Sequence, residues 1–257
     1  MLKTTLLKAT EASGKILQQY FNGSFEVSSK STINDLVTEA DKKSEAVIID
    51  VIRAAYPDHF ILSEEVGEMK TASNVKWIID PIDGTVNFAN GIPICCVSIG
   101  VEKDGEMILG AVYNPFMNEL FLAEKGKGAT LNDKPIHVSV KSNLATSCLV
   151  TGFPYKWNQG PRDPMQVLDH IIREGIPVRR LGSAAIDLCW VACGRFDGFW
   201  EHELQAWDSA AGFLIVEEAG GKVSDFSGNR YSPYQKEILA TNGHIHSALQ
   251  DLINNGK

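Results

Sequence analysis

The sequence contains no long hydrophobic run, since no stretch approaches the roughly 18 consecutive apolar residues that a membrane-spanning helix requires. The short apolar run at the N-terminus is interrupted by Lys8 and Glu11, which argues against a signal peptide. Basic residues are in the minority, because 24 Lys and Arg stand against 32 Asp and Glu and give a net charge of −8. A membrane protein and a general nucleic-acid binder are therefore not expected.

Cysteine is scarce and follows no binding pattern. The chain has 5 cysteines, an odd number, and no Cys-x-x-Cys pair. This favours reduced, buried thiols in a cytoplasmic protein over a disulfide framework. The chain also lacks the Gly-x-x-x-x-Gly-Lys-[Ser/Thr] string of P-loop nucleotide hydrolases, which excludes that class of enzyme.

The overall composition is that of an average soluble globular protein, with 44% apolar and 22% charged residues in a chain of 257. No internal repeat, low-complexity tract or long linker is present. These features predict one domain over residues 1–257, and a division into residues 1–143 and 144–257 is the alternative.

Helical and strand-like segments alternate irregularly along the chain. Apolar residues at helical spacing predict helices at about 2–21, 35–55, 164–173, 184–193, 206–219 and from 244. Short apolar runs between turn residues predict strands at 60–62, 77–79, 94–101, 107–112, 119–123, 146–151, 178–181, near 199 and 238–240. Because strict βαβ alternation is missing, the pattern favours α+β layers over a Rossmann sheet or a TIM barrel.

Two carboxylates follow the apolar run 77–79. Asp80 stands at the end of this predicted strand, and Pro81 is expected to turn the chain there. Asp83 comes three residues after Asp80, so one turn can direct both side chains at the same point. Two carboxylates about 4 Å apart repel by roughly 4 kcal/mol at an effective dielectric constant of 20. A divalent cation removes this penalty, and Mg²⁺ prefers oxygen ligands.

Gly84 and Thr85 follow at a position where a helix can begin. The free N–H groups of a helix N-terminus can bind a phosphate. Three further acids have similar settings: Glu64 follows an apolar run, Asp208 starts a predicted helix, and Asp41 lies within another. Each acid alone is more typical of a solvated side chain or a helix cap. The stretch after Glu64, residues 66–75, is expected to form a loop over the site.

Taken in order, these segments resemble the inositol monophosphatase family of Mg²⁺-dependent, lithium-sensitive phosphomonoesterases. The most specific part is the string Asp-Pro-Ile-Asp-Gly-Thr at residues 80–85. The matching segments extend over nearly the whole chain: 30–41, 63–65, 77–88, 151–155, 181–184 and 207–221. The resemblance implies an α+β fold, namely a five-layer αβαβα sandwich of the sugar-phosphatase type, and a homodimer.

The resemblance also implies a cofactor of two or three Mg²⁺ ions. Glu64, Asp80 and the backbone carbonyl of Ile82 would hold the first ion. Asp80, Asp83 and Asp208 would hold the second, and a third, weaker ion would share Glu64. An acid that bridges two ions fits the logic of two-metal catalysis, in which the ions stabilise the attacking and leaving oxygens.

The implied catalytic residues are Glu64, Thr85 and Asp41. Thr85 would pair with Asp41, and its hydroxyl would act with Glu64 to orient and deprotonate a metal-bound water that attacks phosphorus in line. No Ser, Cys or His nucleophile is needed, because catalysis rests on positioning and charge neutralisation.

The implied substrate pocket lies mostly in the second half of the chain. Glu201 would accept hydrogen bonds from hydroxyl groups of a polyol. The full set of implied substrate-binding residues is Gly84, Thr85, Thr151, Gly182, Ser183, Ala184, Glu201 and Asp208.

The leading functional hypothesis is hydrolysis of inositol monophosphate to myo-inositol and phosphate. Phosphatases of the same fold that act on fructose 1,6-bisphosphate, histidinol phosphate or NADP are the alternatives. The nucleotide-phosphatase branch usually has Lys-Glu after Asp-Gly-Thr, and this chain has Val86 and Asn87 there. A non-catalytic regulatory protein is a further alternative, which the complete set of carboxylates disfavours.

Overall fold

The computed structural model describes the chain except for residues 22, 24–26, 30–35, 155–162 and 256–257. The family segments predicted at 30–41 and 151–155 therefore lie partly outside the described residues. The described helices are α1 (Leu2–Tyr20), α2 (Glu39–Ala55), α3 (Thr85–Ala89), α4 (Pro164–Arg173), α5 (Ala184–Ala192), α6 (Ala206–Glu218) and α7 (His246–Asn255).

The described strands form two large sheets and one short pair. The eight-stranded sheet has the order β10 (Lys134–Pro135), β9 (Ala129–Leu131), β8 (Glu119–Glu124), β7 (Glu106–Asn114), β6 (Cys96–Lys103), β5 (Val75–Asp83), β3 (Phe60–Ser63), β4 (Gly67–Met69). The five-stranded sheet has the order β12 (Val178–Arg179), β11 (Leu149–Thr151), β13 (Gly198–His202), β15 (Glu237–Thr241), β14 (Lys222–Ser224). The short pair is β1 (Val27–Ser29) with β2 (Leu36–Thr38).

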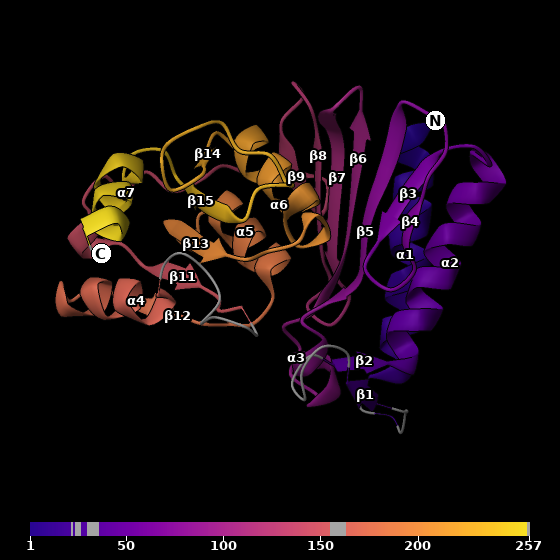
Figure 1. Cartoon of the computed structure of the whole chain (residues 1–257), viewed down its shortest axis with the longest axis horizontal. Coiled ribbons are helices and arrows are strands. Elements are labelled where there is room, and N and C mark those ends of the chain that lie inside the picture. The colour runs from indigo at the N-terminus through magenta and orange to yellow at the C-terminus, as the bar shows by residue number, and fades with distance from the viewer. Residues whose placement is uncertain (22, 24–26, 30–35, 155–162, 256–257) are drawn as a thin grey trace.

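The elements stack in five layers (Figure 1). Helices α1 and α2 cover one face of the eight-stranded sheet, α5 and α6 lie between the two large sheets, and α4 and α7 cover the far side of the five-stranded sheet. Both large sheets are mixed. In the eight-stranded sheet β3 runs parallel to β5, and in the five-stranded sheet β11 runs parallel to both β12 and β13, while the other neighbours are antiparallel. The predicted αβαβα sandwich is confirmed.

Helix α2 begins later than the sequence pattern predicts. The residues just before it form β2 instead, and Thr38 is the N-cap of the helix. The Thr38 hydroxyl accepts from the backbone N–H of Ala40 at 3.2 Å, and the Asp41 carboxylate accepts from the Thr38 N–H at 2.7 Å. This capping box sets the residue at which the helix begins and fixes the Asp41 side chain.

The predicted turn at Pro81 is wrong in detail, since β5 continues to Asp83. The pairing of β5 with β6 shifts register between Asp80 and Asp83, so the proline lies in a bulge of the strand. The predicted loop at 66–75 is also partly wrong, because β4 forms there and pairs with β3. The end of the strand was expected from its apolar run, whereas the bulge depends on how β5 pairs with the neighbouring strand β6.

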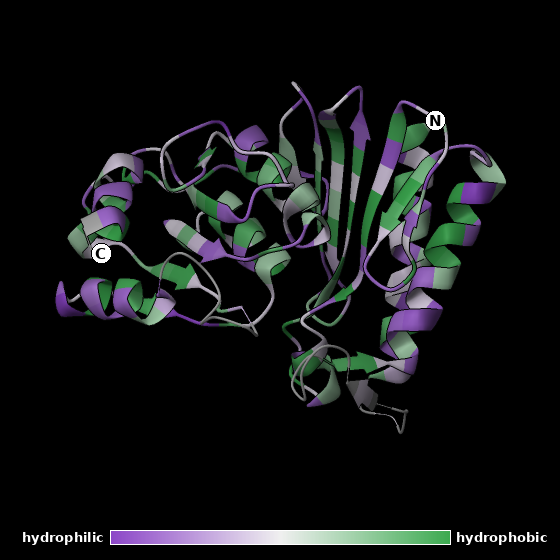
Figure 2. Cartoon of the chain, in the orientation of Figure 1, coloured by the Kyte–Doolittle hydropathy of each residue, from purple (hydrophilic) through white to green (hydrophobic). Residues whose placement is uncertain are grey.

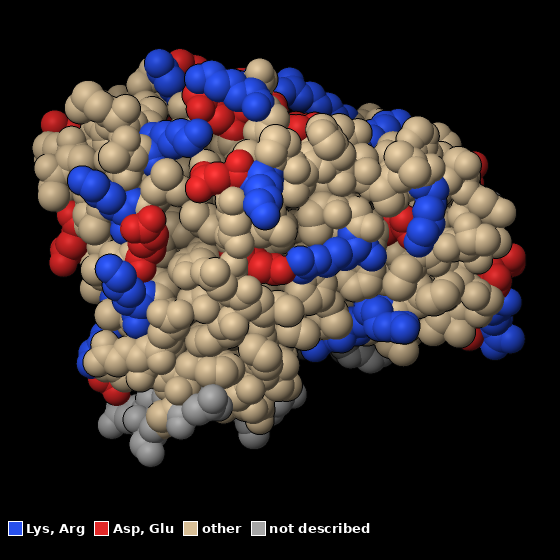
Figure 3. All heavy atoms as spheres, turned by 180° about the vertical axis from the view of Figure 1, so that it is seen from behind, with Lys and Arg blue, Asp and Glu red and all other residues tan. Residues whose placement is uncertain are grey.

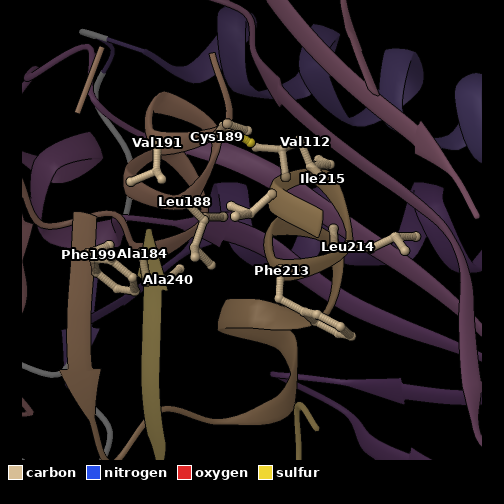
Figure 4. Packing of buried hydrophobic residues seen from close by; sticks show 14 of the residues in the cluster. Val112, Ala184, Leu188, Cys189, Val191, Phe199, Phe213, Leu214, Ile215 and Ala240 are labelled. Carbon is tan, nitrogen blue, oxygen red and sulfur yellow. The ribbon is translucent and has the colours of Figure 1, made fainter. Parts of the chain in front are cut away.

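The largest cluster of buried side chains joins the two sheets through α5 and α6 (Figure 4). Both helices are apolar on nearly every face because each has a sheet on either side. Their close approach requires Gly212, where a Cβ atom would lie 2.7 Å from Leu188 Cδ1. The cluster draws residues from before and after residue 143, and the division there stays a prediction.

Apolar residues in Figure 2 lie along β5 to β8 and on the helix faces packed against them. On the face shown in Figure 3, Lys and Arg are interspersed with Asp and Glu, so this face presents no continuous basic surface. Within the part of the chain that the structure describes, no helix is both long and apolar enough to cross a membrane.

Candidate active site

A pocket of about 450 Å³ lies where the end of β5, the end of β13 and the beginnings of α3, α5 and α6 meet. The described residues that line it include most of the predicted site. They are Leu36, Glu64, Asp80, Ile82, Asp83, Gly84, Thr85, Gly152, Phe153, Pro154, Arg180, Gly182, Ser183, Ala184, Asp187, Glu201, His202, Glu203, Leu204, Gln205, Trp207 and Asp208.

The bulge of β5 turns two acids into the pocket. Asp80 is 2% exposed, and one of its oxygens accepts from the Ile82 N–H at 3.0 Å. Asp83 is 8% exposed and accepts from the Ser183 hydroxyl and the Ala185 N–H, each at 2.7 Å. The start of α5 therefore holds Asp83 in place, about 100 residues away in sequence.

Thr85 lies at the start of α3 with its hydroxyl in a short chain of hydrogen bonds. Its Oγ1 donates to the Ile82 carbonyl at 2.9 Å, and Asp41 Oδ1 lies 3.2 Å away as a second acceptor. Asp41 is fully buried behind Thr85 and is not among the described residues that line the pocket. The structure thus brings two of the three predicted catalytic residues, Thr85 and Asp41, into contact, while their catalytic roles stay predictions.

Gly84 precedes α3 in the left-handed conformation, with φ of +87°. A Cβ atom at this position would lie 2.9 Å from the Ile94 carbonyl oxygen and 3.2 Å from that of Gly182. Both the dihedral angle and the close approach require glycine. Gly84 also lines the pocket, so the backbone beside Asp83 can contact a ligand there.

Glu64 and Asp208 complete the acidic end of the pocket. Glu64 follows β3, and Glu45 of α2 accepts from the backbone N–H groups of Glu65 and Val66, which fixes the turn that carries Glu64. Asp208 lies in the first turn of α6, where it accepts from the Gln205 N–H at 2.7 Å. Both predicted ligands therefore stand beside Asp80 and Asp83.

The electrostatics of this end favour a bound cation. Burial, and then the neighbouring Glu64, raise the pKa of Asp80 well above its usual range. Burial also raises the pKa of Asp83 to about 6, against the hydrogen bonds from the start of α5. The pKa of Asp208 is raised by burial and by Asp83. Among the described residues that line the pocket, Arg180 is the only Lys or Arg. Protons or metal ions must therefore offset these charges.

The donor set fits a hydrated Mg²⁺ ion. Over the described residues, no group of three or more His, Cys, Asp or Glu side chains is arranged to hold a metal by itself. Mg²⁺ does not need such a group, because it usually takes one or two carboxylates, keeps several waters and binds substrate phosphate. The predicted sets that include Glu64, Asp80, Ile82, Asp83 and Asp208 stay predictions.

Glu201, at the end of β13 and 7% exposed, lines the pocket together with the start of α5. Gly152 makes room for Glu201, since a Cβ atom there would lie 2.2 Å from Glu201 Oε2. Thr151 is not brought to the pocket: its hydroxyl donates to the Trp200 carbonyl at 2.7 Å. The role of Thr151 in substrate binding stays a prediction, although its hydroxyl hydrogen is already used in this hydrogen bond.

Sequence reasoning missed Arg180, Gly152 and Asp187 as lining residues. Asp187 had a recognisable signal, because it is the single acid in the apolar segment of α5. Buried carboxylates in such a setting are rarely structural unless they are paired. Arg180 had no such signal, since an exposed arginine beside Arg179 is typical of any surface.

The comparisons with known proteins agree with this geometry. The family model described as Inositol monophosphatase family matches residues 2–255. The chain is 44% identical to Nus factor SuhB of Pasteurella multocida over 98% of its length and 92% of that protein. It is also 44% identical to inositol-1-monophosphatase of Synechocystis sp., over 98% and 89% of the two chains. The crystal structure of extragenic suppressor protein suhB from Bartonella henselae superposes with a TM-score of 0.94 and 38% identity, and covers 100% and 99%.

Proposed function

Because the chain belongs to the inositol monophosphatase family, we propose that it hydrolyses inositol monophosphate to myo-inositol and phosphate with the help of Mg²⁺. The observation that supports this most directly is that one pocket brings together the buried acids, the backbone of Gly84 and Glu201. The acids and the Gly84 backbone, called the phosphate end below, suit a metal and a phosphate. Glu201 and the residues around it, called the polyol end below, suit hydroxyl groups.

At the phosphate end, Asp80, Asp83, Asp208, Glu64 and the Ile82 carbonyl would hold the metal. Bound Mg²⁺ would supply charge neutralisation for the phosphate and a lowered pKa for a nearby water. These acids contribute four negative charges, so two divalent ions would leave the site neutral for a phosphate dianion.

Thr85 would position the attacking water. Its hydroxyl hydrogen is directed to the Ile82 carbonyl or Asp41, so its oxygen remains free to accept a hydrogen bond from the water. Burial raises the pKa of Asp41 to about 6, which suits a group that holds a proton transiently near neutral pH. Glu64 would act beside Thr85 as the second orienting group. No side-chain nucleophile is needed for in-line attack on phosphorus.

The test is phosphate release with Mg²⁺ from a panel: inositol 1-phosphate, fructose 1,6-bisphosphate, histidinol phosphate, 3′-phosphoadenosine 5′-phosphate and NADP, each with and without millimolar lithium. We expect preference for inositol 1-phosphate and inhibition by lithium. Preference for another phosphate would change the substrate and keep the metal site. No release from any of them would overturn the proposal.

The variant Asp83→Asn tests the assignment of the metal-bound end. It keeps the hydrogen bond from Ala185 possible while removing one charge, so we expect the fold to survive and activity to fall at least 100-fold. Asp169→Asn, at an exposed position of α4, is the matched control. Retained turnover in Asp83→Asn would contradict the assignment.

A non-catalytic role is the second candidate, because a relative with 44% identity is named Nus factor SuhB. Such a role would depend on the protein surface rather than on the acids of the pocket. Complementation of a strain lacking this protein by Asp83→Asn would favour it, and failure of that variant would favour catalysis. In either role we expect a cytoplasmic homodimer.

A further inference from the structure

Asp187 is a buried acid without a structural partner. It lies in the first turn of α5, lines the pocket and is 1% exposed. Among the described residues, none donates a hydrogen bond to either of its carboxylate oxygens. A buried carboxyl group with no donor destabilises a fold. Such a group in a pocket wall points to a ligand that supplies the missing hydrogen bond.

The charged surroundings of Asp187 do not provide that partner. Apart from its burial, the acids Glu201 and Asp83 are the main causes that raise its pKa well above the usual range. The opposing charge is Arg180, whose side chain is exposed at the pocket. Asp187 is thus placed among like charges, which no packing requirement of α5 explains.

Helix α5 couples this acid to the phosphate end of the pocket. Asp83 accepts hydrogen bonds from Ser183 and Ala185, and the Asp187 N–H donates to the Ser183 carbonyl at 3.0 Å. The first turn of α5 therefore connects the residues that hold Asp83 with Asp187. A substrate whose phosphate lies beside Gly84 would present its far side to Asp187 and Glu201.

The chemistry of this end selects hydroxyl groups. Two acids, Asp187 and Glu201, repel a second phosphate or any other anionic group. A hydroxyl can donate to a carboxylate and can also accept from a carboxylic acid, so it satisfies Asp187 in either protonation state. An ammonium group satisfies only the ionised state, which burial disfavours.

We propose that Asp187 determines substrate specificity together with Glu201, by hydrogen bonding to a polyol hydroxyl distant from the phosphate. The inference rests on the proposed function and deepens it. It assigns the inner wall of the pocket to polyhydroxylated phosphomonoesters, and it explains why an otherwise apolar helix contains a buried acid.

The experiment compares Asp187→Ala and Asp187→Asn with the wild type on inositol 1-phosphate and on 4-nitrophenyl phosphate, which has no hydroxyl. In Asp187→Ala, the KM for inositol 1-phosphate should rise roughly tenfold relative to that for 4-nitrophenyl phosphate, with little change in kcat. Asp187→Asn keeps an acceptor of the same shape and should restore most of this loss. Asp169→Ala on the exposed face of α4 is the control.

Thermal unfolding separates this role from a structural one. Because Asp187 has no hydrogen-bond partner among the described residues, Asp187→Asn should keep or raise the Tm. A lowered Tm, or equal losses on both substrates, would overturn the proposal. If the wild type hydrolyses neither substrate, the proposed function fails instead. Calorimetry with myo-inositol then decides the role of Asp187, and equal binding by wild type and Asp187→Ala would overturn it.

Discussion

At the scale of single residues, the site depends on groups that are costly for the fold. Asp80 and Asp187 are nearly fully buried acids, and each has a raised pKa because burial and neighbouring acids disfavour its charge. Such groups are retained where a metal, a substrate or a proton uses them. Gly84 is a comparable case in the backbone. Only glycine can adopt its positive φ and fit the small space beside the Ile94 carbonyl.

Gly84→Ala should reduce phosphate binding more than stability. The added methyl group would meet the Ile94 carbonyl at 2.9 Å in a left-handed conformation, so the turn between Asp83 and Thr85 must shift. We expect a loss of about 1–3 kcal/mol in unfolding free energy and a loss of kcat/KM of at least about 200-fold, which corresponds to more than about 3 kcal/mol. Gly105→Ala, also at positive φ but with open space, is the control for backbone strain alone. Equal effects of the two variants on activity would contradict a local role for Gly84.

At the scale of elements, helix starts hold the acids of the candidate site. Helix α2 presents Asp41 through its capping box, α5 binds Asp83, and α6 carries Asp208 in its first turn. Each helix start supplies free N–H groups that fix a carboxylate. The helix starts therefore fix the orientation of the Asp41, Asp83 and Asp208 side chains.

Thr38→Ala should destabilise the protein through α2. The variant removes the N-cap hydroxyl that accepts from the N–H groups of Ala40 and Asp41. We expect a loss of about 1 kcal/mol in unfolding free energy, measured by urea denaturation. Thr4→Ala, at an exposed position inside α1, should be nearly neutral. A neutral Thr38→Ala would show that the capping box does not limit the stability of α2.

His246 at the start of α7 should make stability depend on pH. Its Nδ1 lies 3.0 Å from Thr241 Oγ1 and its Nε2 lies 2.9 Å from Ser224 Oγ. Burial, and then Lys222, lower the pKa of His246 to about 4. The unfolded chain, with a histidine pKa of about 6.5, then binds the proton more readily. The stabilisation is complete above pH 6.5 and is lost as the pH falls toward 4.

The measurement is the unfolding free energy of wild type and His246→Gln at several values between pH 7.5 and pH 4. The difference between the two proteins removes the contribution of the buried acids, whose raised pKa values act in the opposite direction. This difference should fall on acidification with a slope of at most about 1.4 kcal/mol per pH unit. A constant difference would mean that His246 is protonated equally in the folded and unfolded states.

At the scale of the whole molecule, the pocket exists because two sheets meet across α5 and α6. The end of β5 belongs to the eight-stranded sheet, and Glu201 on β13 belongs to the five-stranded sheet. The apolar cluster between the sheets fixes their distance and so fixes the position of Glu201 relative to the acids at the end of β5. Any ligand that contacts both Glu201 and these acids should therefore stabilise the whole fold.

Mg²⁺ should raise the Tm of the protein, and a chelator should reverse the increase. An ion that binds the folded state only, at 100 times its dissociation constant, adds about 2.7 kcal/mol. For a chain of this length that corresponds to an increase of roughly 5–10 °C. Asp83→Asn should lose most of the increase, and Asp169→Asn should retain it. An equal increase in both variants would place the ion elsewhere.

The sequence by itself determined the layers and most of the acidic end. The helices over 2–21, 164–173, 184–193 and 206–219 agree with the structure to within one residue, because apolar spacing and end signals are local. Asp80, Asp83 and Gly84 were recognisable from one short string. Their positions follow from the strand that delivers them and the helix that starts after them.

Only the tertiary structure decided which distant residues share the pocket. The bulge at Pro81 depends on β6, the beginning of α2 depends on the pairing of β1 with β2, and Asp187 acquires meaning only when α5 is placed beside Glu201. Thr151 likewise lies outside the pocket because β11 pairs with β13 and its hydroxyl donates to the Trp200 carbonyl. These features arise from contacts between different elements, some neighbouring in sequence, as for β5 and β6, and some distant, as for Thr151 and Trp200. The preferences of single residues contain no information about such contacts.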